Sequence, residues 1–282
     1  MQEKILNGKL LADKILDEIA VQISGQNPTR NPALAVVLVG DDPASQVYVR
    51  NKKLACSKVG IKSVEYLLDA ATTEKELLEL VTKLNLDDTL DGILVQLPLP
   101  KHLNSKMVID TILPNKDVDG FHRYNMGSLA LNNPNLSPCT PHGIMYMLDS
   151  LNINYHGKNV VILGSSNIVG RPMALELLNR GATVTVCNSK TQNLSHIARS
   201  ADILISAIGK AKFVTKDFVK DDAIVIDVGM NRDVNGKLCG DVDFDNVVEI
   251  VSKITPVPFG VGPMTIAMLI VNTMKCYQLN KK

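Results

Sequence analysis

The chain contains 282 residues, of which 45% are apolar and 21% charged, and its formal net charge is +1. This length suits two globular domains, and the balanced charge gives no field of one sign that would favour nucleic acid or a membrane surface. No apolar run approaches the roughly 20 residues of a membrane span, and residues 1–4 lack the apolar core of a signal peptide. Five widely spaced cysteines without a CxxC pair indicate reduced thiols in a cytoplasmic protein, and the five histidines show no metal-ligand spacing.

The first half of the chain alternates helix and strand patterns. Apolar spacing predicts helices over 8–23, 43–59 and 73–85, and strands over 35–39, 63–68 and 93–96. Asp42 is a plausible N-cap with Pro43 in the first turn, Gly60 ends that helix, and Thr73 and Glu76 form a capping-box pattern. This order predicts a parallel sheet with right-handed crossovers, whose ligand-binding residues gather beyond the carboxyl ends of the strands.

The second half predicts another α/β unit. Residues 114–141 are rich in Pro, Asn, Asp and Gly and are expected to form a loop, after which Thr140-Pro141 would begin a helix to about 151. Strands are predicted over 160–163, 183–187, 202–206 and 223–228, with helices over 171–180 and 264–279. The predicted fold is therefore α/β with two α/β domains, residues 1–140 and 141–263. The second is a Rossmann-like doubly wound parallel sheet, the active site lies in the cleft between them, and helix 264–282 packs back on the first.

A tight turn after the strand 160–163 indicates a dinucleotide site. It reads Gly164-Ser165-Ser166-Asn167-Ile168-Val169-Gly170, and small residues there let the backbone approach a pyrophosphate at the N-terminus of the next helix. A plain strand–helix connection is the alternative. NAD-binding proteins carry a carboxylate after the second strand, where this chain has Ser189 and Lys190. A hydroxyl and an ammonium can accept a 2′-phosphate, which predicts NADP, although Lys190 as a merely solvated lysine is the simpler interpretation.

Four polar residues are predicted at the ligand edge of the first sheet. Tyr48 and Lys52 are four apart and share one helix face, Gln96 ends a strand, and Asp119 lies in the loop 117–120. Taken singly they suggest a surface pair, a strand cap and an Asx-turn. Together they place a phenol, an amine, an amide and a carboxylate at one edge. The Tyr-x-x-x-Lys pair of short-chain dehydrogenases follows the nucleotide-binding glycines, whereas here the pair precedes them in another domain, so that interpretation is rejected.

Six segments carry a family resemblance along nearly the whole chain. They are VGDDPASQVYVRNKKLACSKVGI (39–61), DGILVQLPLP (91–100), KDVDGF (116–121), PCTPHG (138–143), GSSNIVGRPMA (164–174) and TPVPFGVGPMT (255–265). On these motifs the sequence resembles the bifunctional methylenetetrahydrofolate dehydrogenase/methenyltetrahydrofolate cyclohydrolase family. The resemblance implies NADP-dependent oxidation of 5,10-methylenetetrahydrofolate, hydrolysis of the 5,10-methenyl product to 10-formyltetrahydrofolate, and a homodimer.

The resemblance also assigns residues. The family's folate-stacking tyrosine falls on Tyr48, its catalytic lysine on Lys52, the glutamine that bonds this lysine on Gln96, and the pterin-binding aspartate on Asp119. Its cofactor positions fall on Gly164, Ser165, Ser166, Ser189 and Met230. Water must attack the methenyl cation, so a positioned lysine that can become neutral makes chemical sense as the base.

Two departures and two rival interpretations stay open. Many family members have Arg where this chain has Ser165, so the NADP preference rests on Ser189 and Lys190. Many also have Gly where this chain has Phe259, whose ring would narrow the site or point outward. A monofunctional dehydrogenase is one rival, disfavoured by Lys52 and Gln96. A non-catalytic nucleotide-binding protein is the more distant one. No metal, nucleic acid or membrane partner is expected.

Overall fold

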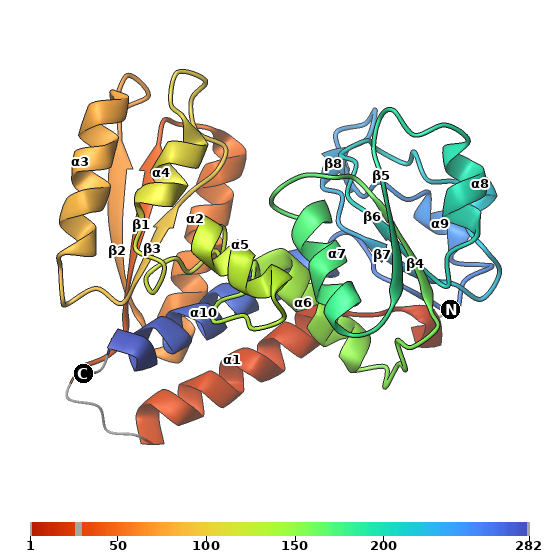
Figure 1. Ribbon diagram of the computed structural model, residues 1–282, viewed down its shortest axis with the longest axis horizontal. Coiled ribbons are helices and arrows are strands. Elements are labelled where there is room, and N and C mark those ends of the chain that lie inside the picture. The colour runs from red at the N-terminus through yellow and green to blue at the C-terminus, as the bar shows by residue number, and fades with distance from the viewer. Residues whose placement is uncertain (1, 26–29, 281–282) are drawn as a thin grey trace. The chain divides into compact units, whose positions relative to one another are not determined.

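The computed structural model describes residues 2–25 and 30–280, and its chain divides into two compact units. The three-stranded unit comprises Asp13–Cys139 and Ile266–Lys282, and the five-stranded unit comprises Met1–Ala12 and Thr140–Thr265. Each unit is a parallel sheet covered by helices (Figure 1). The predicted end of the last helix at 281–282 lies outside the described residues.

The sheet of the three-stranded unit has the order β2-β1-β3, with all strands parallel. Its strands are β1 (Ala33–Val39), β2 (Lys62–Leu68) and β3 (Gly92–Val95). Its helices are α2 (Pro43–Val59), α3 (Glu74–Asn85), α4 (Ser105–Thr111) and α5 (Arg123–Ala130), and α1 (Gly8–Gly25) and α10 (Val261–Asn280) contribute most of their residues. The strands and helices predicted from the sequence are all present in this unit.

Alternation along β1 explains why this strand is buried on both faces. Ala33, Ala35, Val37 and Val39 pack in one apolar cluster with residues of α3 and α4 such as Leu77. The intervening residues of β1 are buried toward the other face, and α2 packs against β1 and β2. Figure 1 shows α3 and α4 together on one side of this sheet. A strand covered on both faces is expected to be a continuous apolar run, as β1 is.

The helix-end signals act as predicted. The Asp42 carboxylate accepts a hydrogen bond from Ser45 N at 2.8 Å, and Gly60 ends α2 with a φ of 85°. Thr73 and Glu76 form both hydrogen bonds of the capping box at the start of α3. Because α2 begins directly beyond the carboxyl end of β1, its first three turns stand at the ligand edge of the sheet.

The five-stranded unit has the order β10-β7-β6-β4-β5, again fully parallel. Its strands are β4 (Asn159–Leu163), β5 (Thr183–Cys187), β6 (Ile203–Ser206), β7 (Ile224–Asp227) and β10 (Lys253–Ile254). Its other elements are η1 (Gln2–Lys4), α6 (Cys139–Asp149), α7 (Gly170–Asn179), α8 (Leu194–Arg199), η2 (Lys216–Phe218), the hairpin β8 (Asn231–Arg232) and β9 (Leu238–Cys239), and α9 (Phe244–Val247). Residues of α8 and α9 share an apolar cluster with one face of the sheet, and α7 packs against β4 and β5.

Three details of the sequence prediction are wrong. Residues 114–141 are not all loop, because they contain α5, which begins where His122 Nδ1 accepts a hydrogen bond from Tyr124 N at 3.0 Å. Helix α6 begins at Cys139, so Thr140 is inside it and its hydroxyl contacts that of Thr265 at 2.9 Å. The second sheet has a fifth strand, β10, which is two residues long and too short to give a sequence pattern. Within residues 2–25 and 30–280, no helix combines the length and apolarity needed to cross a membrane.

Candidate active site

A buried lysine–amide pair forms the centre of the candidate site in the three-stranded unit. Lys52 on α2 is only 6% exposed, and its Nζ donates to Gln96 Oε1 at 2.9 Å. Gln96 directly follows β3; its backbone N donates to Val37 O at 2.8 Å, and its Nε2 donates to Leu97 O at 2.5 Å. With the amide hydrogens directed at the backbone, the side-chain oxygen faces the lysine. The sheet thus fixes the direction of the lysine amine.

Tyr48 lies one helical turn before Lys52 on α2 and is half-buried. Burial raises the pKa of its phenol, because desolvation penalises the charged form. A neutral, partly exposed ring on the same helix face as the lysine can offer a flat surface to an aromatic ligand.

Asp119 lies between α4 and α5 and is partly exposed. Burial raises its pKa to about 6, the positive charge of Lys52 lowers it, and the negative charge of Asp117 raises it further. Lys52 is therefore close enough to Asp119 to act on its carboxyl electrostatically. The structure brings Lys52, Gln96 and Asp119 into one electrostatic neighbourhood within a single unit.

Asp117 shapes the loop that carries Asp119. It is 1% exposed, and its carboxylate accepts hydrogen bonds from Gly120 N at 3.1 Å, His122 N at 2.8 Å and Asn125 Nδ2 at 2.9 Å. Burial raises the pKa of Asp117, while the hydrogen bonds from Asn125 and from the backbone of His122 lower it. The Asp117 carboxylate therefore organises this loop through backbone N–H groups three and five positions on, in place of the Asx-turn considered for it, and Asp119 is left available to a ligand.

Asn272 is a residue of this site that sequence reasoning missed. It is fully buried on α10, and its Nδ2 donates to Val118 O and to Ser137 O, both at 2.9 Å. Cys139 Sγ also donates to Val118 O at 3.2 Å. The backbone just before Asp119 and that of Ser137 are thus tied to the C-terminal helix. The available signal was a lone amide in an apolar helix, which requires partners when buried.

In the five-stranded unit, the predicted dinucleotide turn has the backbone that a phosphate requires. Gly164 has a φ of 119°, and a Cβ there would meet Ala207 O at 2.3 Å. A Cβ on Gly170 would meet Gly164 O at 1.9 Å, so glycine is needed at both positions. The N-terminus of α7 carries no side-chain cap hydrogen bond, and Ser166 Oγ accepts from Val169 N at 3.1 Å. An anion fits such an uncapped helix start.

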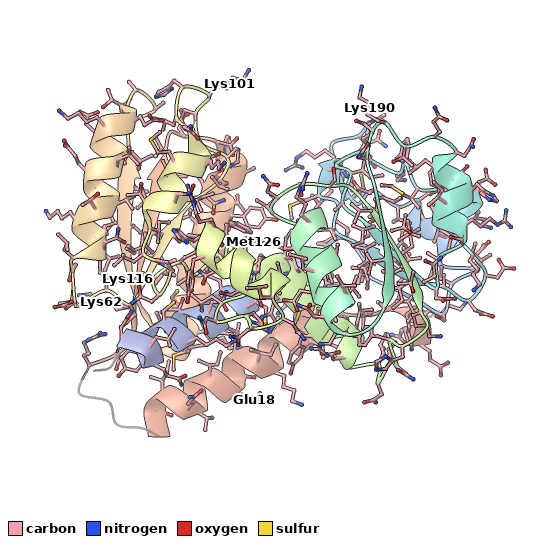
Figure 2. The ribbon with its side chains drawn as sticks, viewed as in Figure 1. Glu18, Lys62, Lys101, Lys116, Met126 and Lys190 are labelled. Atoms are coloured by element: carbon pink, nitrogen blue, oxygen red, sulfur yellow. The ribbon has the colours of Figure 1, made fainter. Side chains whose placement is uncertain are left out.

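A second turn follows β5, where the ribose of the adenosine half is expected. Asn188 Oδ1 accepts from Lys190 N at 2.9 Å, and Thr191 Oγ1 accepts from Asn188 N at 2.9 Å. These bonds leave the side chains of Ser189 and Lys190 exposed, and Figure 2 shows Lys190 at the margin of its unit. Both side chains are free to meet a 2′-phosphate. Met230, after β7, is 48% exposed.

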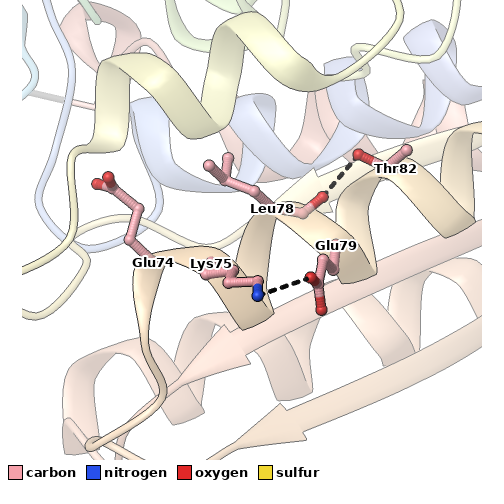
Figure 3. Close-up of a pocket in the computed structure, with 5 residues that line it drawn as sticks. All are labelled: Glu74, Lys75, Leu78, Glu79 and Thr82. Carbon is pink, nitrogen blue, oxygen red and sulfur yellow. Dashed lines mark hydrogen bonds and ion pairs between the residues drawn. The ribbon is translucent and has the colours of Figure 1, made fainter.

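Two further features bear on the site prediction. Phe259 has a φ of 82°, a region that favours glycine, and its side chain is 53% exposed. A hollow on the outer face of α3 is lined by Glu74, Lys75, Leu78, Glu79 and Thr82 (Figure 3). This hollow contains none of the predicted site residues. Its Lys75–Glu79 ion pair, 3.9 Å apart, is largely exposed and contributes little to the stability of the fold.

The two units together define a class of protein. A glycine turn at the start of α7 in a parallel sheet is the phosphate-binding feature of nicotinamide-nucleotide enzymes. The buried Lys52–Gln96 pair adds a positioned amine that such a cofactor does not require. The chain therefore has the parts of a nucleotide-dependent oxidoreductase with a second, proton-transferring function.

Comparison with known proteins identifies the family. The model of the tetrahydrofolate dehydrogenase/cyclohydrolase catalytic domain matches residues 6–119, and that of the tetrahydrofolate dehydrogenase/cyclohydrolase NAD(P)-binding domain matches residues 138–281. The bifunctional protein FolD of Acetivibrio thermocellus is 51% identical over 283 residues, covering 100% of this chain and 99% of the relative. The chain belongs to the tetrahydrofolate dehydrogenase/cyclohydrolase family.

Solved structures of similar proteins support the same family assignment. The bifunctional enzyme FolD of Campylobacter jejuni is 50% identical with a TM-score of 0.95, covering 98% of each chain. The Trypanosoma brucei enzyme, complexed with NADP cofactor and inhibitor, is 36% identical with a TM-score of 0.93, covering 98% of this chain and 97% of that one. These matches confirm the family resemblance, the α/β fold with a Rossmann-like second domain, the nicotinamide cofactor, and an enzyme of one-carbon folate metabolism with dehydrogenase and cyclohydrolase activities.

Proposed function

We propose that the protein oxidises 5,10-methylenetetrahydrofolate with NADP and hydrolyses the resulting 5,10-methenyl compound to 10-formyltetrahydrofolate. The Lys52–Gln96 contact of 2.9 Å carries this proposal, because hydride transfer alone needs no positioned amine. In this scheme residues 1–140, with the C-terminal helix, bind the folate, and residues 141–263 bind the cofactor through Gly164, Ser165, Ser166, Ser189 and Met230.

The oxidative step uses the substrate's own electrons. Bound NADP would supply the acceptor for a hydride from the methylene carbon, and the two folate nitrogens beside that carbon would stabilise the cation that remains. Tyr48 supplies a flat neutral face for the folate ring system. The ionised Asp119 accepts hydrogen bonds from the ring N–H and exocyclic amine of the pterin, which orients the substrate.

The hydrolytic step needs a group that takes a proton from water. Water adds to the methenyl carbon and loses a proton to Lys52, which leaves a neutral hydroxyl adduct. One C–N bond of this adduct then breaks as the hydroxyl proton is lost and the departing nitrogen takes up a proton, so that the formyl group stays on the other nitrogen. The cationic substrate favours the neutral amine through like-charge repulsion. Gln96 accepts from the ammonium through Oε1 and holds the amine in place in both protonation states.

A monofunctional dehydrogenase is the alternative within the family, and one assay separates the two. We expect the purified protein to hydrolyse methenyltetrahydrofolate in the absence of any nicotinamide cofactor, at a rate above the spontaneous reaction. Loss of the absorbance of the methenyl compound measures this directly. A rate equal to the buffer blank, with the dehydrogenase reaction intact, would leave only the monofunctional alternative.

The choice between NADP and NAD depends on the turn after β5. We expect a higher kcat/KM with NADP than with NAD, because Ser189 and Lys190 are exposed after β5 and no carboxylate stands there. Ser189→Asp should lower kcat/KM for NADP by about tenfold or more and spare NAD, since a like charge beside the 2′-phosphate costs more than a lost hydroxyl. Ser189→Ala is the control that removes the hydroxyl without adding charge. Equal use of both cofactors by the unmodified protein would contradict the assignment.

Assembly and location complete the proposal. We propose a cytoplasmic homodimer that takes tetrahydrofolate derivatives and neither nucleic acid nor membrane as partners. The β5 edge supports the dimer: Thr183, Thr185 and Val186 are exposed although they lie in a strand, and an open edge is commonly covered by a symmetric partner. Light scattering at micromolar concentration should give twice the chain mass of 30.7 kDa. A monomer mass would refute the dimer.

A further inference from the structure

The five-stranded unit holds two buried aspartates that the proposed chemistry does not use. Asp241 is fully buried, and Asp227, the last residue of β7, is 3% exposed. Burial raises the pKa of Asp227 to about 7, and the charge of Asp241 nearby contributes to the increase. A buried carboxylate destabilises a fold unless hydrogen bonds compensate it, so the partners of these groups show what they hold in place.

Asp241 accepts hydrogen bonds from three successive backbone N–H groups and two side chains. The donors are Ile208 N at 2.7 Å, Gly209 N at 3.1 Å, Lys210 N at 3.0 Å, Ser206 Oγ at 3.1 Å and Asn231 Nδ2 at 2.9 Å. Ser206 is the last residue of β6 and residues 208–210 follow it, whereas Asn231 follows β7. A single carboxylate therefore ties together the segments that leave two neighbouring strands.

The backbone packs tightly against the two carboxylates. Asp227 Oδ1 accepts from Gly229 N and from Asp241 N, both at 2.9 Å. A Cβ on Gly229 would meet Asp241 Oδ1 at 2.3 Å, and a Cβ on Gly240 would meet Asp227 Oδ2 at 1.8 Å. Because the backbone lies directly against the carboxylates, only glycine fits at both positions.

The sheet order locates these segments relative to a bound dinucleotide. Strand order reverses at β4, with β5 on one side and β6 and β7 on the other, and dinucleotides bind across such a switch point. Gly164, after β4, touches the start of the segment after β6, since its Cβ would meet Ala207 O. Ser189 and Lys190 follow β5, so the adenosine half belongs to that side. The nicotinamide half therefore belongs to the side of β6 and β7.

We infer that Asp241 is a positioning residue that holds residues 208–210 and 229–231, the two segments bordering the nicotinamide half of the dinucleotide. The inference rests on the proposed NADP function. Met230 lies in the second segment, next to Asn231, whose amide donates to Asp241. Without the carboxylate, three backbone N–H groups, one amide and one hydroxyl lose their common acceptor, and the two segments are no longer joined through it.

The test separates the two halves of the cofactor. Titration calorimetry of Asp241→Asn should show an NADP Kd about tenfold or more above that of the unmodified protein, the effect of losing one charge-assisted hydrogen bond. The Kd of 2′,5′-ADP, which contains only the adenosine half, should stay unchanged. Hydrolysis of methenyltetrahydrofolate without cofactor should also persist, because Lys52, Gln96 and Asp119 belong to the other unit.

Two further variants keep the test decisive. Asp202→Asn is the matched control. Asp202 accepts hydrogen bonds from Asn159 N at 3.0 Å and Lys220 Nζ at 2.7 Å, at the opposite ends of the same strands. The Asp202→Asn variant should therefore bind both NADP and 2′,5′-ADP normally. If Asp241→Asn does not fold, Asn231→Ala decides, with a selective loss of NADP affinity expected. Unchanged NADP affinity, or an equal loss for NADP and 2′,5′-ADP, would overturn the inference and spare the proposed function. An unmodified protein that binds no NADP would overturn both.

Discussion

Lys52→Met should almost abolish the cyclohydrolase activity and reduce the dehydrogenase activity much less. The substitution keeps most of the side-chain volume and the helix propensity but removes the amine. Loss of a general base typically lowers a rate by ~10²–10⁴-fold, whereas hydride transfer is driven by the folate nitrogens. The variant should therefore release methenyltetrahydrofolate, which its absorbance identifies, in place of the formyl product.

Lys53→Met is the matched control for this experiment. Lys53 is the next residue of α2, and its Nζ pairs with Glu65 Oε2 at 2.6 Å on the surface, with the lysine side chain 55% exposed. The control should retain both activities, since exposed ion pairs contribute little. If Lys52→Met lowers both activities in equal proportion, while the variant folds and binds NADP normally, Lys52 is a shared binding residue and not the base.

Asp119→Asn should weaken folate binding in both reactions and remove a pH dependence. The pKa of Asp119 is about 6, so its carboxyl is ionised above that pH and can accept from the pterin donors. As pH falls through about 6 the carboxyl is protonated, and the KM for folate should rise in the unmodified protein. Hydrogen bonds to charged groups contribute about 1.5–3 kcal/mol, so the variant should show a KM about tenfold or more higher at pH 7.5, with no inflection near 6.

Although Asp119→Asn should weaken folate binding, it should increase the stability of the fold. Because the pKa of Asp119 is raised on folding, the folded state holds this proton more tightly than the unfolded chain does. The group therefore lowers the free energy of unfolding as pH rises from about 4 to about 6, and this loss stays constant at higher pH. Asp119→Asn should be more stable than the unmodified protein at pH 7.5, and the difference should shrink below pH 6. Asp88→Asn, an exposed carboxylate in the same unit, should change neither KM nor stability. An inflection near pH 6 that persists in Asp119→Asn would assign it to another group.

Local signals made much of the fold predictable. The bounds of α2 follow from Asp42, Pro43 and Gly60, each of which acts within one turn of its own position. Strands β4, β6 and β7 of the second sheet are nearly continuous apolar runs, which parallel strands covered on both faces require. The same reasoning fails for α5, whose eight residues have little apolar periodicity and are fixed by Asn125, buried and bonded to Asp117 and Pro114.

The candidate site was predictable where a motif carried it and not where distant contacts did. Lys52 and Gln96 are 44 residues apart, yet Lys52 lies in a predicted helix and Gln96 ends a predicted strand at the same sheet edge. Asn272 and Val118 are 154 residues apart, and no spacing rule relates them. Asp241 likewise holds residues more than 30 positions away through tertiary packing alone. Such buried polar partners become visible only when the sheets are assembled.

The central claim is that one chain performs both steps, and a single time course tests it most directly. The purified protein is mixed with 5,10-methylenetetrahydrofolate and NADP, while the reduced cofactor, the methenyl compound and the formyl product are followed together. The account predicts formation of reduced cofactor with 10-formyltetrahydrofolate as the main product and little free methenyl compound. Methenyltetrahydrofolate accumulating in proportion to the reduced cofactor, and decaying only at the spontaneous rate, would contradict the account.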